Sequence, residues 1–262
     1  MASGASFFFP LLLLLSAISG ISSETAIRLP SENLVAGGNR KVRADDGVFC
    51  DSWKLAVETN NAGNWKQIPA RCAAFVQAYM TGGQYSSDLE VIGKLSSEFA
   101  RSVKLVGDDR DAWVFDIDET LLSNLPYYEE TGFGTEIFNE TSFDEWVKLA
   151  KAPALLPSFS LHNELQELGF KIILLTGRSE QQRSATEANL LFAGYRNWER
   201  LILRGPSDQG KTAAQYKSEK RSELVEEGYR IHGNSGDQWS DLWGFAVASR
   251  SFKLPNPMYY IA

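Results

Sequence analysis

Two aspartates, Asp116 and Asp118, follow a short apolar run at residues 112–115 in the stretch DAWVFDIDETLLSN. On an extended segment, side chains two residues apart point to the same side, so these carboxylates would face one another. Their negative charges repel, and burial strengthens the repulsion. The pair therefore requires a compensating cation, either a bound metal ion or a basic side chain.

Further groups suited to phosphate or metal chemistry follow later apolar runs. They are Thr176 and Arg178 after the second run, and Asp237 and Asp241 after the fourth. A helical stretch before the fourth run carries several lysines. We expect a divalent cation and one lysine ammonium to neutralise the carboxylates, with a phosphoryl group bound between them.

Short apolar runs alternate with amphipathic stretches from residue 111 onward. The runs occupy residues 112–115, 171–175, 201–203, 229–231 and 245–248. This alternation predicts an α/β fold: a Rossmann-like, mainly parallel sheet with helices on both faces. Ligands of such sheets bind beyond the carboxyl ends of the strands, so the polar residues above should meet at one edge.

The chain divides into four predicted segments. Apolar residues at helical spacing precede the strands, and an aromatic, Gly- and Pro-containing stretch interrupts the strand–helix rhythm and is too long for a plain loop. The predicted segments are a signal peptide (1–23), a weakly ordered leader (24–47), an N-terminal helical region (48–108) and a core (109–262) with a small cap insertion at about 121–156.

The first 23 residues carry no charged side chain and contain an apolar run followed by small residues. This pattern predicts a secretory signal cleaved near residues 20–23. The alternative is a membrane anchor, but the apolar run at 7–18 is shorter than the about 20 residues that span a bilayer. No later run is long enough to span, so we expect no membrane contact after cleavage.

The two cysteines, Cys50 and Cys72, agree with a secretory route. An even number of cysteines in an oxidising compartment favours a disulfide, with two buried free thiols as the alternative. Asn139 begins an Asn-Glu-Thr sequon and is a predicted glycosylation site. The formal net charge of −7 is scattered along the chain, which argues against a nucleic-acid partner.

Two other kinds of site do not fit the sequence. A calcium-binding EF-hand loop starting at Asp116 would need Gly at its sixth position and Glu at its twelfth, where the chain has Leu121 and Tyr127. A histidine phosphatase would usually carry an Arg-His-Gly type of signature, which neither His162 nor His232 provides. Both readings are rejected.

The motifs VFDIDET, LLTG and GDQWSD, with a helix lysine before the last, resemble the haloacid dehalogenase superfamily of phosphotransferases. The chain is more similar still to plant acid phosphatases and vegetative storage proteins, through the stretches at 52–61 and 216–242. The resemblance runs from about residue 50 to the end of the sequence. It implies an acid phosphatase acting on phosphate monoesters, with a storage or defence protein as the alternative.

The resemblance also implies roles at matching positions. Asp116 would be the nucleophile that forms an aspartyl-phosphate, and Asp118 the general acid and then the base. Thr176 and a lysine would contact the phosphoryl oxygens. The lysine context favours Lys217 and leaves Lys211 open. Arg178 either supports the loop or touches phosphate.

Mg²⁺ is the implied cofactor. The ion would be held by Asp116, Asp237 and the backbone carbonyl of Asp118. Asp241 would either bind the ion or orient the groups that bind it. The expected partners are small phosphorylated substrates, with a homodimer left open, and the expected location is the vacuole or the extracellular space. Aromatic residues of the cap would either border the leaving group or form a local apolar cluster: Tyr127, Tyr128, Phe133 and Trp146.

Overall fold

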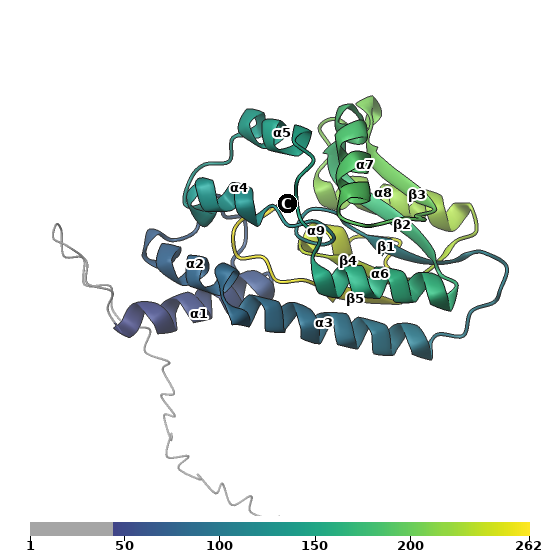
Figure 1. The fold of residues 1–262 in the computed structure, drawn as a ribbon, viewed down its shortest axis with the longest axis horizontal. Coiled ribbons are helices and arrows are strands. Elements are labelled where there is room, and N and C mark those ends of the chain that lie inside the picture. Colours follow the sequence, from purple (N-terminus) through teal and green to yellow (C-terminus); the bar gives the residue numbers. More distant parts are fainter. Residues whose placement is uncertain (1–43) are drawn as a thin grey trace, which may run out of the picture. The chain divides into compact units, whose positions relative to one another are not determined.

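The structure is a computed structural model that describes residues 44–262 (Figure 1). The predicted signal peptide and residues 24–43 of the predicted leader lie outside the described residues. Within 44–262, every helix is too short or too polar to cross a bilayer.

Five strands form one sheet in the order β3-β2-β1-β4-β5, and every neighbouring pair is parallel. Their bounds are β1 Asp111–Phe115, β2 Lys171–Ser179, β3 Arg200–Arg204, β4 Arg230–Gly236 and β5 Arg250–Lys253. All residues of β1 are buried, as expected for the central strand of a sheet covered on both faces. The predicted Rossmann-like α/β fold is confirmed.

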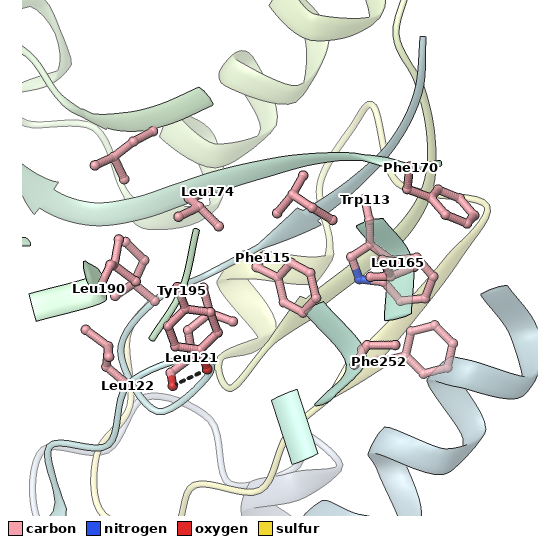
Figure 2. Close-up of a cluster of buried hydrophobic side chains, with 14 of the residues drawn as sticks. Trp113, Phe115, Leu121, Leu122, Leu165, Phe170, Leu174, Leu190, Tyr195 and Phe252 are labelled. Atoms are coloured by element: carbon pink, nitrogen blue, oxygen red, sulfur yellow. Dashed lines mark hydrogen bonds between the residues drawn. The ribbon is translucent and has the colours of Figure 1, made fainter. Parts of the chain in front are cut away.

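Alternate residues of β1 pack into separate apolar clusters on the two faces of the sheet. Trp113 and Phe115 lie in one cluster with Leu165 of α6 and Leu190 of α7 (Figure 2), to which α3 also contributes side chains. Ala112 and Val114 lie in the other, which side chains from α8 cover. This alternation is the two-residue period of a strand. Helices therefore cover both faces of the sheet.

β4 contains Gly233, Asn234 and Ser235, which make it less apolar than a buried strand usually is. Trp113 of β1 explains two of these residues. A Cβ atom at Gly233 would lie 2.3 Å from the Trp113 ring, and the indole nitrogen of Trp113 donates to the Ser235 hydroxyl over 3.0 Å. The small and polar residues of β4 thus accommodate one large buried side chain.

The prediction of a strand at 245–248 is wrong, because the last strand is β5 at Arg250–Lys253. Phe245 and Val247 are exposed, and Ala246 has a positive φ of 49°, which a strand does not allow. The buried guanidinium of Arg221 donates to the backbone carbonyls of Ala246 and three nearby residues. These carbonyls are therefore bound by a side chain instead of a neighbouring strand.

Helices precede, interrupt and cover the sheet. The N-terminal region holds α1 Ala44–Glu58, η1 Ala70–Cys72, α2 Ala73–Thr81 and α3 Gly83–Ser102. Between β1 and β2 lie α4 Leu125–Glu130, η2 Gly132–Gly134, α5 Glu140–Lys148 and α6 Leu156–Leu168. The remaining helices are η3 Glu180–Gln182, α7 Arg183–Phe192, η4 Pro206–Asp208, α8 Ala213–Glu226 and α9 Trp239–Leu242. α1 thus begins before residue 48, the predicted start of the helical region.

Cys50 and Cys72 form a disulfide that joins α1 to η1, with Cα atoms 5.4 Å apart. Replacing both cysteines by serine should lower the free energy of unfolding by about 3 kcal/mol, because the unfolded chain regains the entropy of the closed loop. Urea denaturation under oxidising conditions measures this loss. An unchanged midpoint in the double variant would contradict it.

Candidate active site

Three carboxylates meet at the carboxyl edge of the sheet. Asp116 follows β1, Asp237 follows β4, and Asp241 lies in α9. One oxygen from each lies within 4.8 Å of the others, and all three side chains are buried. The parallel topology places these residues together although more than a hundred positions separate the first two in the sequence.

Lys217 of α8 lies between two of these carboxylates. Its ammonium pairs with Oδ1 of Asp116 and Oδ1 of Asp241. Lys211 lies just before α8, outside this group, and pairs with Asp208 over 2.8 Å and with Glu219. Of the two lysines that the sequence left open, the fold therefore brings Lys217 to the nucleophile candidate.

The buried group holds three carboxylates and one ammonium, so ionising all of them would leave two negative charges unbalanced. Burial, reinforced by the neighbouring carboxylates, raises the pKa of Asp116 well above its ordinary value and that of Asp237 to about 8. Burial opposes the charge on Lys217, but Asp116 and Asp241 outweigh it and raise the lysine pKa. A divalent cation would balance the remaining charge.

The donors at this site are carboxylate oxygens, the ligands that hard divalent cations prefer. The charge and the donor set therefore fit a divalent metal ion. Asp118 is close in sequence, but its side chain makes other contacts, which suits the expectation that only its backbone carbonyl would reach a metal.

Asp118 is held by Arg178, which extends from β2. The Nη2 and Nε atoms of the guanidinium donate to the carboxylate over 2.6 Å and 3.0 Å, and the Asn124 amide donates over 2.8 Å. Burial alone would raise the pKa of Asp118, but the charge and hydrogen bonds of Arg178 outweigh it and lower the pKa. The Asp118 side chain is 20% exposed, against 7% for Asp116. It is thus the more accessible carboxylate of the DIDET pair.

Two hydroxyl groups lie at the strand ends. Thr176 is fully buried in β2, and its Oγ1 accepts from the backbone N–H of Arg178 over 3.1 Å, which leaves its own proton free to be donated. Thr120 donates to Oδ2 of Asp116 over 3.3 Å. The sequence pattern had indicated Thr176 but not Thr120, although Thr120 belongs to the same DIDET motif.

The cap connects to the site through Asn124. Its Oδ1 accepts from the indole N–H of Trp146 over 2.8 Å, while its amide group contacts Asp118. The other cap aromatics, Tyr127, Tyr128 and Phe133, are buried in an apolar cluster with side chains of α2 and α3. The sequence allowed these three aromatics either to border the leaving group or to pack in an apolar cluster, and the fold shows packing.

Glu119 is a buried carboxylate whose importance the sequence pattern did not indicate. It accepts from the backbone N–H of Asn124 and from the Tyr259 hydroxyl, and it has a positive φ of 53°. Burial, helped by the charge of Asp118, raises its pKa to about 7. Asn256 and Gln238, which also went unpredicted, donate to Asp237. No motif could have indicated Asn256, because its partner is 19 positions away.

Asn139, the predicted glycosylation site, is exposed at the start of α5. Its Oδ1 accepts from the backbone N–H of Ser142 over 3.1 Å and caps the helix. The side chain lies on the protein surface within the cap, so a glycan would meet no buried neighbour. The modification itself stays a prediction.

The model of the HAD superfamily, subfamily IIIB (acid phosphatase) matches residues 39–262. The chain belongs to this family. Acid phosphatase 1 of Solanum lycopersicum is 49% identical over 253 residues, which cover 97% of this chain and 98% of that protein. Vegetative storage protein 1 of Arabidopsis thaliana is 36% identical, with 96% of each chain covered. This family member is thus an acid phosphatase by class, with storage proteins among its relatives.

A solved structure shares the fold of this acid phosphatase family member. The class C acid phosphatase of Bacillus anthracis superposes with a TM-score of 0.60 at 24% identity, covering 72% of this chain and 85% of that one. The same bacterial enzyme with tungstate bound has a TM-score of 0.57 at 25% identity, with the same coverage. The disulfide and the plant relatives are consistent with secretion.

Proposed function

We propose that this acid phosphatase hydrolyses phosphate monoesters through an aspartyl-phosphate on Asp116, with Mg²⁺ as its cofactor. The observation that carries the proposal is the position of Asp116: it is buried at the end of the central strand, beside Lys217 and two further carboxylates. A carboxylate in contact with an ammonium can attack a phosphoryl group whose oxygens share that ammonium.

The reaction has two balanced steps. In the first, an oxygen of Asp116 bonds to phosphorus, the bond from phosphorus to the ester oxygen breaks, and Asp118 gives its proton to the leaving alcohol. In the second, Asp118 takes a proton from water, the water oxygen bonds to phosphorus, and the acyl phosphate bond breaks. Inorganic phosphate leaves, and the Asp116 carboxylate returns to its starting state.

Lys217 and Thr176 are the proposed contacts to the phosphoryl oxygens. Lys217 is already beside Asp116, and Thr176 has a hydroxyl proton to donate. The bacterial class C relative with tungstate bound supports an oxyanion site in this family, because tungstate is a tetrahedral oxyanion like phosphate.

We propose that Asp116, Asp237 and the backbone carbonyl of Asp118 hold the Mg²⁺ ion, with Asp241 as a further ligand or as the partner that orients Lys217. When bound, the ion would balance the charge of the carboxylates and of the phosphoryl oxygens. Mg²⁺ keeps several water ligands, so a small number of protein oxygens is sufficient. The proposed substrates are small phosphorylated compounds, and the proposed location is the vacuole or the extracellular space.

Trapping of the covalent intermediate tests this proposal. Acid added during turnover of p-nitrophenyl phosphate should leave one PO₃ unit on the protein, and peptide mass spectrometry should locate it on Asp116. An unmodified Asp116 peptide, in a sample whose turnover is confirmed by released nitrophenol, would contradict the proposed intermediate.

Arg178 should set the pH range of this reaction. The active form needs a proton on Asp118, and the protonated fraction falls as the pH rises through the pKa of that group. Arg178 lowers this pKa against the effect of burial. Replacing Arg178 by Gln should therefore raise the pKa and move the alkaline limb of the kcat/KM profile upward by about one pH unit or more.

A matched control is Arg183→Gln, because Arg183 pairs with Glu180 on the surface and does not contact Asp118. Its profile should overlay that of the original protein. A profile of Arg178→Gln that keeps its alkaline limb, whatever happens to the maximal rate, would show that Asp118 is not the titrating acid.

A storage role is the second candidate, because relatives at 36% identity over nearly the whole chain are named vegetative storage proteins. Asp116 is retained here, which favours catalysis over storage alone. Comparing the abundance of the protein with phosphatase activity across plant organs separates the two roles.

A further inference from the structure

The carboxylate of Asp237 is held by two side-chain amides. Its Oδ2 accepts from Nδ2 of Asn256 and from Nε2 of Gln238, each over 2.7 Å. Among the residues that the structure describes, none donates a hydrogen bond to Oδ1. Asp237 is also 2% exposed, so solvent does little to orient it. The two amides therefore fix the plane of the carboxylate and leave one oxygen for a ligand.

Besides the amide nitrogen that bonds to Asp237, two further atoms of Asn256 are held by hydrogen bonds. Its backbone N–H donates to Oε1 of Glu58 over 3.0 Å, and its Oδ1 accepts from the backbone N–H of Met258 over 2.9 Å. An amide oxygen can accept but not donate, so the Met258 contact determines which end of the amide faces Asp237. Asn256 therefore presents a donor to Oδ2 and cannot present its oxygen.

Glu58 links this arrangement to the N-terminal helices. It is the last residue of α1, and its Oε2 accepts from the Lys253 ammonium over 2.8 Å. Its backbone carbonyl accepts from the indole N–H of Trp239, two residues after Asp237, over 3.0 Å. α1 thus contacts both the segment that carries Asp237 and the residue that orients it.

We propose that Asn256 is a positioning residue for the metal site: it directs the free oxygen of Asp237 toward the ion, and Glu58 holds Asn256 in place. This inference rests on the metal site of the proposed function. Partners that orient a metal ligand typically contribute a factor of about 10 to 100 in metal affinity. The N-terminal helical region would then contribute to the metal site, because Glu58 of α1 holds the residue that orients Asp237.

Isothermal titration of the full chain with Mg²⁺ alone, without substrate, tests the proposal. Asn256→Ala should bind Mg²⁺ about 10- to 100-fold more weakly than the original protein. If Asn256→Ala does not fold, Asn256→Ser, whose hydroxyl is too short to reach Oδ2, has the same expected result.

Asn189→Ala is the matched control. Asn189 is equally buried, and its side chain bonds to the backbone N–H and carbonyl of Ala152 over 3.0 Å and 2.7 Å. This variant should lower the thermal midpoint measured in EDTA and leave the Mg²⁺ dissociation constant unchanged. A purely structural role for Asn256 would give the same pattern.

The outcomes separate the two proposals. If the original protein binds Mg²⁺ and Asn256→Ala binds it equally well, the positioning role is wrong and the metal site stands. If the original protein does not bind Mg²⁺, the proposed metal site and the role of Asn256 are both overturned.

Discussion

Asp116→Asn should reduce kcat/KM for p-nitrophenyl phosphate in the presence of Mg²⁺ by about 10⁴-fold or more. The amide has the size of the carboxylate, but its oxygen is a far weaker nucleophile and cannot form the acyl phosphate. The change also removes a buried negative charge that burial already disfavours, so it should not unfold the protein. Stopped-time assays with and without Mg²⁺, together with a thermal melt, give the rate and the folding state of the variant.

Asp208→Asn is the control for this substitution. Asp208 is a buried aspartate in η4 that pairs with Lys211 over 2.8 Å, outside the carboxylate group at the sheet edge. Its loss should lower stability and leave the rate within a few-fold of the original. Equal rates for Asp116→Asn and the original protein would mean that the phosphoryl group is transferred elsewhere.

The sheet was largely predictable, because its central strands bury both faces. The run at 112–115 is continuously apolar, as is 172–175 after Lys171, and the two correspond to β1 and β2. The run at 245–248 looks similar in composition but forms a loop in which Phe245 and Val247 are exposed. Its carbonyls are bound by Arg221, more than twenty positions earlier. A local pattern contains no information about such a distant donor.

The strand-end carboxylates were predictable for a topological reason. Parallel strands end at one edge, so Asp116 and Asp237 had to approach each other once the strands were assigned. Arg178 was harder to interpret, because its contact with Asp118 joins residues 60 positions apart. Its type and place in the sequence allowed two roles, and only the fold shows that it binds the second aspartate of the pair.

The residues that hold Asp237 in place could not be predicted from sequence patterns. Asn256 lies in a segment with no recognisable motif. Glu58 lies in the 52–61 stretch that resembles the family, but its contact with Asn256 beside Asp237 appears only in the fold. The cap aromatics show the opposite case. Their composition allowed either a binding role or local packing, and the fold shows Tyr127 and Tyr128 buried against the N-terminal helices. Aromatic residues in an insertion thus serve packing as readily as recognition.

Substitution of Lys217 is the second change for which we expect a large loss of activity. Lys217→Met should reduce kcat by about 10² to 10³-fold, which is the range for losing one preorganised electrostatic contact to a reacting oxyanion. Methionine fills the buried volume of the lysine stem but leaves Asp116 and Asp241 without their shared ammonium. The variant should therefore also be less stable, and its residual activity is to be normalised to the folded fraction.

Lys211→Met is the matched control, since Lys211 lies just before the same helix and pairs with Asp208 and Glu219. Its rate should stay within a few-fold of the original. Titration with Mg²⁺ adds a readout that a folding defect would not produce. Removing the ammonium leaves the carboxylates more negative, so Lys217→Met should bind the cation at least as tightly while it turns over slowly. A large loss of rate in Lys211→Met with none in Lys217→Met would reverse the assignment of the phosphate-binding lysine.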